Sequence, residues 1–215
     1  MGVKLGVRLT MDPIILPEPK KSGGMPVMEA ISLRRTNRNM RLKEVPLQVL
    51  SDLLWAAFGV NRDKASFNKL GRTAPSASNS QEIDLYVALE SGLYLYEAVP
   101  HQLTPVSEKD IRVFSCGRYA GELTKHTPVN IFYVVDLSRY DLGPDQPDPN
   151  IGDAEVQKSY YYTDTGFIAQ NINLFAASEG LATWFHNCEK ESIRTEFKLR
   201  STQRILFAQT VGYPQ

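Results

Sequence analysis

The chain has 215 residues, enough for one substantial hydrophobic core, and nothing in its composition requires a second domain. Its 24 basic and 24 acidic side chains give a net charge of zero, so we expect neither nucleic acid nor a membrane as a partner, and any anion site must be local. The two cysteines, Cys116 and Cys188, exclude a disulfide scaffold but not a single bridge.

The amino-terminal segment mixes Lys4 and Arg8 into its apolar residues, so it lacks the continuous apolar segment of a signal peptide. We therefore expect a cytoplasmic location; the alternative is an exported form from which a signal peptide has been removed. Residues 11–25 contain three prolines and two adjacent glycines, a composition typical of extended chain. We interpret residues 1–25 as an extended arm and residues 26–215 as a single domain.

Two helices are predicted next, and each is opened by a proline. Pro26 suits the first turn of a helix that ends in the basic cluster RRTNR, residues 34–38. Pro46 opens a second helix, in which apolar residues keep helical spacing over residues 47–58. We expect Gly59 to end this helix in the left-handed conformation that glycine commonly adopts there.

A long loop and three strands follow. Residues 61–81 are polar and small, and a loop of about twenty residues inside a compact domain is usually functional or disordered. Residues 85–89 and 93–96 are predicted to form a hairpin, with a third strand through Leu103. The strongly apolar segment 129–136 is predicted to be a central strand.

A long helix is predicted from Ala154 to Leu181, and no charged side chain occurs between Asp164 and Glu179. Its apolar residues follow two neighbouring stripes of helical spacing, one with Phe167, Leu174 and Leu181 and the other with Ile168, Ile172 and Phe175. Such a helix presents apolar faces in more than one direction. We therefore expect it to serve the protein core and a subunit interface together.

The remaining chain mixes strand and helix patterns. Residues 182–186 are predicted to be a short strand, residues 189–199 an amphipathic helix and residues 205–211 a final strand. Because strands and helices are intermixed without a regular βαβ alternation, we predict an α+β fold with a central, mainly antiparallel sheet flanked by helices.

Three segments carry residues suited to ligand binding. Arg34, Arg35 and Arg38 can meet one phosphate with charge-assisted hydrogen bonds, although such a cluster is also typical of a solvated surface. Residues 75–81 (PSASNSQ) offer backbone groups and short donors to a polar ligand, or form a simple turn. Residues 180–188 (GLATWFHNC) are predicted to reverse the chain after the long helix. There are two interpretations of this segment: its backbone N–H groups face the ring system of a ligand, or its aromatic residues simply pack in the core.

The order and separation of these segments resemble the FMN-dependent nitroreductase family. That family shows an arginine-rich segment in its first helix (RRTNR here), a Pro-Ser loop leading to Asn and Gln (PSASNSQ here), a buried helix of the form GFIAQNINLFAASEGL and a closing Gly-Tyr strand end (VGYP here). The resemblance covers residues 26–214. The segment LLWAAFGVNR before RTAPSA further resembles the branch that includes the dehydrogenases acting on thiazoline and oxazoline peptides.

The resemblance implies a homodimer with two FMN molecules at the subunit interface, each contacted by both chains, and with the long helix at that interface. The phosphate and ribityl end would be held by Arg34, Arg35, Thr36 and Arg38. The residues expected to arrive from the partner subunit are Pro75, Ser76, Ala77 and Asn79. The backbone that faces the isoalloxazine edge, with a donor to the flavin N5, is expected from Phe185, His186 and Asn187, and Arg118 is expected near the pyrimidine. Family members often continue past the closing Gly-Tyr with basic residues, so here the phosphate contact is expected from the first helix alone.

The resemblance also implies an oxidoreductase in which FMN takes hydride from NADH or NADPH and reduces a small-molecule acceptor, such as a nitroaromatic or a quinone, by a ping-pong mechanism. No catalytic side chain is then required. No metal is expected either, because His101, His126 and His186 lie far apart without ligand spacing. The alternatives are a flavin-dependent dehydrogenase of a heterocycle or small metabolite and a flavin-binding protein without turnover.

Overall fold

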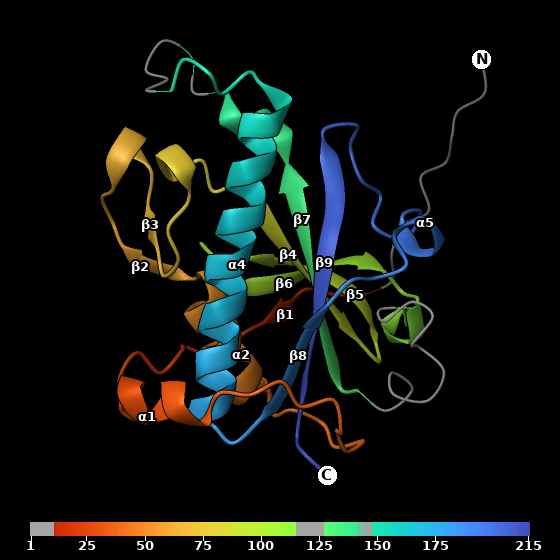
Figure 1. Cartoon of the computed structure of the whole chain (residues 1–215). Helices are drawn as coiled ribbons and strands as arrows, with labels where there is room; N and C mark the ends of the chain where they lie inside the picture. Colours follow the sequence, from red (N-terminus) through yellow and green to blue (C-terminus); the bar gives the residue numbers. More distant parts are fainter. Residues whose placement is uncertain (1–10, 115–126, 142, 144–147) are drawn as a thin grey trace, which may run out of the picture.

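The computed structural model describes residues 11–114, 127–141, 143 and 148–215. Its centre is a seven-stranded sheet in the order β1-β6-β5-β4-β7-β9-β8, and every neighbouring pair is antiparallel. The strands are β1 (Ile14–Ile15), β4 (Ile83–Leu89), β5 (Gly92–Glu97), β6 (Gln102–Ser107), β7 (Val129–Asp136), β8 (Ala182–His186) and β9 (Gln203–Gly212). Helices flank this sheet (Figure 1), so the predicted α+β fold with a mainly antiparallel sheet is confirmed.

Strand β7 is the buried strand of the sheet, and all eight of its residues are inaccessible to solvent. Ile131 and Tyr133 pack into the core on the helical side, whereas Phe132 and Val134 pack into a second core on the opposite side. A strand buried on both faces needs an unbroken apolar run, which explains why its pattern does not alternate. The prediction of a central strand at residues 129–136 is confirmed.

Three helices pack on one face of the sheet, namely α1 (Val27–Leu33), α2 (Leu47–Phe58) and α4 (Ala154–Ser178). Helix α4 crosses in front of the sheet in Figure 1, with α1 and α2 packed against it. The opposite face is covered by the 3-10 helix η3 (Arg112–Phe114), by helix α5 (Lys190–Ile193) and by the chain around Phe197. The longest helix therefore lies on the side of the sheet that carries the larger core.

Helix α4 has well-defined ends because the sequence supplies both caps. The side chain of Asp153 accepts hydrogen bonds from the N–H groups of Glu155 and Val156, at 2.8 and 3.2 Å. At the other end Gly180 has φ +67°, and Leu181 N–H donates to the carbonyl of Ala176 at 2.8 Å, which closes the last turn. The helix thus ends at Ser178, three residues before the predicted end.

The two predicted apolar stripes of α4 have different environments. Ile168 and Ile172 are fully buried against the sheet. Phe167 is 44% exposed, and Tyr162, five residues earlier and about 140° away around the helix, is 40% exposed. The single chain therefore leaves large apolar side chains of α4 uncovered. The exposed surface of α4 around Phe167 is called the α4 outer face below.

Two local expectations were wrong. Gly59 has an extended backbone at φ −72° rather than a left-handed one. A Cβ at Gly59 would lie 2.4 Å from Cδ1 of Trp55, so glycine is required there by close packing and not by a turn. The predicted helix at residues 189–199 contains only the single helical turn of α5. The helix ends after Ile193, and both Ile193 and Phe197 are buried in the second core, where Phe197 is only 1% exposed.

The predicted loop at residues 61–81 contains ordered structure of its own. Strands β2 (Val60–Arg62) and β3 (Gly71–Arg72) pair as a separate two-stranded sheet; the 3-10 helix η1 (Ser66–Asn68) connects them and the 3-10 helix η2 (Ala77–Asn79) follows β3. In Figure 1 this unit projects beside α4. No alternating pattern in residues 61–81 is long enough to indicate such short strands.

Residues 11–25 run in extended form over the rest of the chain. β1 pairs with the outer edge of β6. Farther along, Ser51 Oγ donates to the carbonyl of Pro17 at 2.5 Å and Lys20 N–H donates to Asp52 Oδ1 at 2.8 Å, so α2 holds this segment. No helix within the described ranges is long and apolar enough to cross a membrane.

Candidate functional site

The arginine-rich segment lies beside strand β8 and the end of the chain. The N–H of Asn37 donates to the carbonyl of Thr183 at 3.0 Å, and the N–H of Arg41 donates to the carbonyl of Tyr213 at 2.8 Å. The N–H of Gln215 donates back to the carbonyl of Asn39 at 3.1 Å. Two segments that were singled out separately in the sequence, 34–38 and 180–188, are therefore joined by one backbone hydrogen bond, from Asn37 to Thr183.

A cavity of about 420 Å³ opens between these segments. Arg34, Arg35 and Asn37 line one side of it. The other side is formed by the carboxyl end of α4 and by the start of β8, through Asn173, Ala177, Gly180, Leu181 and Thr183. Both arginines are exposed, and no ion pair to either one occurs within the described part of the chain. Their donors are available for an anionic ligand.

Arg38 behaves differently from its two neighbours. Its guanidinium lies over the ring of Trp184, 5.0 Å from the ring centroid, in a cation–π contact. It does not line the cavity. Thr36, which lies between Arg35 and Arg38 in the sequence, is exposed. The expected phosphate contacts of Thr36 and Arg38 remain predictions, whereas Arg34 and Arg35 already border a cavity of suitable size.

The side chains of Phe185 and His186 are engaged within the protein. The ring of Phe185 packs against Tyr133 and Phe207, with centroids 5.7 and 4.9 Å away. In His186, Nδ1 lies 2.8 Å from the carbonyl oxygen of Asn187 and Nε2 lies 2.8 Å from Oγ1 of Thr210. Burial lowers the pKa of His186, so its imidazole is neutral near neutral pH. Neither side chain is free to act on a ligand.

The backbone of β8 does have a free edge, because β8 is the last strand of the sheet. The carbonyl of Thr183 points away from β9, since it accepts from Asn37. Backbone groups in a strand alternate with a period of two, so the N–H and carbonyl of Phe185 point to the same outer edge. Asn187, just past the strand, is exposed. The backbone at Phe185 can therefore offer a donor to a ligand that lies along this edge.

The Pro-Ser loop, residues 75–81, is held in a fixed shape by its own hydrogen bonds. Gln81 N–H donates to Ser76 Oγ at 3.0 Å, and the side chain of Asn79 donates to the carbonyl of Ser66 and accepts from Gln81. Ser78 and Asn79 have φ of 51° and 49°, values that residues other than glycine adopt rarely. Pro75 is exposed, and Ala77 is partly so.

The loop and the arginine segment lie at different levels of α4. Ala77 contacts the helix at Asp164, whereas Arg34 and Arg35 share their cavity with Ala177. Those two helix positions are about 20 Å apart along the axis. Within one chain the loop and the arginines therefore do not line a common cavity, and Figure 1 shows the two regions at different heights along α4.

Comparison with known proteins identifies the family. The sequence model of the nitroreductase family matches residues 31–213. This chain belongs to the nitroreductase family. A candidate nitroreductase of Methanocaldococcus jannaschii is 25% identical over 172 residues, which are 74% of this chain and 80% of that relative.

Solved structures show the same fold. The crystal structure of a candidate nitroreductase from Ralstonia eutropha is 30% identical, covers 94% of this chain and 90% of its own, and has a TM-score of 0.80. An FMN-dependent nitroreductase from Clostridium difficile shares the fold at 19% identity, with a TM-score of 0.57 and 87% coverage of both chains. The resemblance of the sequence and the nitroreductase-like fold are thus confirmed, and the family makes the chain an oxidoreductase.

In this nitroreductase-family chain, sequence reasoning missed the group that anchors the Pro-Ser loop. Asp164 Oδ2 accepts a 2.8 Å hydrogen bond from the N–H of Ala77. The nearest sequence signal was that Asp164 is the last charged residue before the uncharged part of the long helix. A charged residue on a buried helix face indicates a specific partner, because burial without one is costly.

Arg118, which was expected near the pyrimidine, and Cys116 lie outside the described residues.

Proposed function

We propose that this nitroreductase-family chain is an FMN-dependent oxidoreductase that uses NADH or NADPH to reduce nitroaromatic, quinone or related acceptors by a ping-pong mechanism. One observation carries the proposal. The arginines at the end of α1 and the free backbone edge of β8 border the same part of the molecule, around the cavity of about 420 Å³. One ligand with a phosphate and a flat ring could use both.

The donors in this region fit FMN. Arg34 and Arg35 are exposed and without ion pairs among the described residues, so they can hold a phosphate through charge-assisted hydrogen bonds. The N–H at Phe185 lies on an open strand edge and can donate to a ring nitrogen. Bound FMN would supply the hydride chemistry, and the chain would bind it, orient it and exclude water.

We infer that the active form is a homodimer. The Pro-Ser loop is about 20 Å along α4 from the arginine cavity, so it can reach an FMN only from a second subunit. The α4 outer face provides an apolar surface for that contact, with Phe167 44% exposed. A two-fold axis beside α4 would bring the loop of each chain toward the arginines of the other.

The first experiment is the absorbance spectrum of the purified protein, with and without added FMN. A flavin spectrum that bleaches with NADH or NADPH and recovers with a quinone or a nitroaromatic supports the proposal. A colourless protein that takes up no FMN contradicts every flavin-based function. Bound flavin without nicotinamide oxidation would instead indicate a binding protein, and recovery only with a heterocyclic substrate would indicate a dehydrogenase.

The phosphate contact has its own test. Arg34→Ala combined with Arg35→Ala is expected to weaken FMN binding at least about tenfold, because each lost charge-assisted hydrogen bond costs about 1.5–3 kcal/mol. Arg41→Ala is the matched control, since Arg41 is exposed in the same segment but does not line the cavity. Equal FMN affinity in the double variant and in the control would show that the phosphate lies elsewhere.

A further inference from the structure

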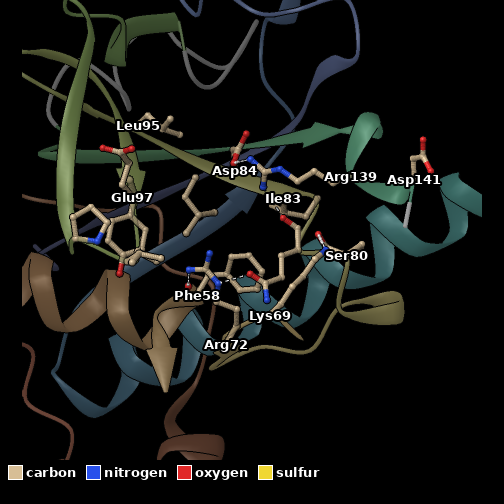
Figure 2. A pocket seen from close by; sticks show the side chains of 16 residues that line it. Phe58, Lys69, Arg72, Ser80, Ile83, Asp84, Leu95, Glu97, Arg139 and Asp141 are labelled. Carbon is tan, nitrogen blue, oxygen red and sulfur yellow. Dashed lines mark hydrogen bonds and ion pairs between the residues drawn. The ribbon is translucent and has the colours of Figure 1, made fainter. Parts of the chain in front are cut away.

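A second cavity, of about 550 Å³, lies between the end of α2, strand β3 and the β4–β5 hairpin (Figure 2). It shares no lining residue with the candidate flavin cavity. Much of its wall is apolar and is formed by Phe58, Ile83, Leu85, Leu95, Tyr96 and Val99. Its volume falls within the range of ordinary small-molecule sites.

Arg72 lines this cavity, and within the described residues it forms no ion pair. Its Nε donates to Oε1 of Gln81 at 2.8 Å and its Nη1 donates to the carbonyl of Phe58 at 3.2 Å. The guanidinium also lies over the ring of Phe58, 5.2 Å from the centroid. All of these partners are neutral. Burial lowers the pKa of Arg72, which shows that its surroundings disfavour the charge.

Lys69 has the same kind of environment. Its Nζ donates to the carbonyls of Asn79 and Ser80, both at 3.2 Å, and these acceptors are again neutral. Burial lowers the pKa of Lys69, and the positive charge of Arg139 lowers it further. Arg139 also lowers the pKa of Arg72. Arg139 is therefore close enough to repel both Lys69 and Arg72.

The carboxylates that line the cavity are engaged elsewhere. Asp84 pairs with Arg139 at 2.5 Å and also accepts from Gln203. Glu97 accepts hydrogen bonds from Gln102 and Thr104 on β6. Asp141 is exposed. Within the described residues none of the three forms an ion pair with Arg72 or Lys69.

The hydrogen-bond partners of Arg72 and Lys69 are all neutral, and both side chains are only partly exposed, so a bound counter-charge would lower the cost of removing these cations from water. We propose that this cavity binds an organic anion, a carboxylate with an apolar tail, whose headgroup meets Arg72 and Lys69 and whose tail lies on Ile83, Leu85 and Leu95. The same two cations also bond to residues 79–81, so an anion bound here would contact side chains that support the Pro-Ser loop.

The test uses hexanoate as the probe and isothermal titration calorimetry of the full chain, without added flavin. Hexanoate is expected to bind more than tenfold more tightly than hexanamide, which has the same tail without the charge. It should also bind more tightly than acetate, which has the charge without the tail. Equal binding of hexanoate and hexanamide would overturn the anion site, and equal binding of hexanoate and acetate would overturn the role of the apolar wall.

Variants locate the site. Arg72→Gln and Lys69→Met are each expected to weaken hexanoate binding about tenfold or more, since each removes a charged donor. Arg62→Gln is the matched control, because Arg62 is exposed on the neighbouring strand β2 and does not line the cavity. Unchanged affinity in folded Arg72→Gln and Lys69→Met proteins would overturn the proposal.

A variant that is expected to bind hexanoate more tightly provides a test that misfolding cannot imitate. Asp84→Asn removes the carboxylate that now neutralises Arg139, so hexanoate should bind at least about threefold more tightly as the local positive charge rises. A folded Asp84→Asn protein with unchanged or weaker binding would contradict the electrostatic basis of the site. None of these measurements depends on FMN. The flavin function can therefore be disproved while the anion site is confirmed, and the anion site can be disproved while the flavin function is confirmed.

Discussion

The N–H of Ala77 donates a 2.8 Å hydrogen bond to Oδ2 of Asp164, and this contact ties the Pro-Ser loop to the middle of α4. Asp164 is 4% exposed. It interacts with Glu82, which is fully buried and whose Oε2 accepts from Ser80 Oγ at 2.6 Å. The other oxygen of Glu82 has no hydrogen-bond partner among the described residues. Two buried carboxyl groups therefore meet at the base of the loop.

The free energy of unfolding should decrease as the pH rises toward 8, because of the buried carboxyl groups of Asp164 and Glu82. Burial, together with the neighbouring charge of Glu82, raises the pKa of Asp164 to about 8. In the unfolded chain an aspartate has a pKa of about 3.9. Between these values the folded chain holds more protons than the unfolded chain, so this contribution to stability decreases with rising pH and is constant above about pH 8. The slope from this one group is at most about 1.4 kcal/mol per pH unit.

Asp164→Asn tests that dependence, because the amide can still accept from Ala77 but carries no charge. Denaturant unfolding at pH 5, 7 and 9 should show a flatter pH dependence in this variant than in the parent, with the variant the more stable of the two at pH 9. Asp63→Asn, at an exposed aspartate in residues 61–81, is the control and should follow the parent. Parallel curves for the parent and Asp164→Asn would disprove the raised pKa of Asp164.

His186 should make the chain sensitive to acid. Burial lowers the pKa of His186, so below its ordinary value of about 6.5 the unfolded chain takes up a proton that the folded chain resists. This contribution to stability is therefore lost as the pH falls through that value. Unfolding between pH 7.5 and 5 should be less pH-dependent in His186→Gln than in the parent. An equally steep loss in the variant would show that His186 has the same pKa in the folded and the unfolded chain.

Gly180→Ala should destabilise the chain by about 1 kcal/mol. Gly180 has φ +67°, and a Cβ built there meets no atom within 4 Å, so the cost would come from the backbone conformation alone. Gly152→Ala is the control, because that glycine is equally open but does not have a positive φ. Its effect should stay within about 0.5 kcal/mol in chemical unfolding. Equal effects of the two substitutions would contradict the assigned role of Gly180 at the end of α4.

Phe167→Glu should convert the proposed homodimer to a monomer, because it puts a charge on the α4 outer face. Size-exclusion chromatography with light scattering gives the mass directly. Val99→Glu is the control, since Val99 is 67% exposed but lies in the turn between β5 and β6. FMN uptake should fall together with the dimer, because the partner's loop would be removed. A parent protein that is already monomeric would contradict the interface.

Some features of this protein could be read from the sequence because they depend on local pattern. The apolar run at 129–136 is long enough to identify a strand buried on both faces. The uncharged part of α4 indicates a buried helix, which begins at Ala154 as predicted but ends three residues before the predicted end. The order of the RRTNR, PSASNSQ and GFIAQNINL segments was sufficient to suggest the family, and the family match confirms it.

Other features were decided only by the tertiary structure. Gly59 makes room for the side chain of Trp55 instead of forming a left-handed turn, and residues 189–199 leave the helix after Ile193 while Phe197 still packs into the second core. The arginine segment meets β8 through a backbone hydrogen bond, which any sequence can form and no side-chain pattern therefore reveals. The distance between the Pro-Ser loop and the arginine cavity likewise depends on where each contacts α4. The sequence by itself determined the elements and the family, whereas long-range contacts decided how the candidate site is divided along α4.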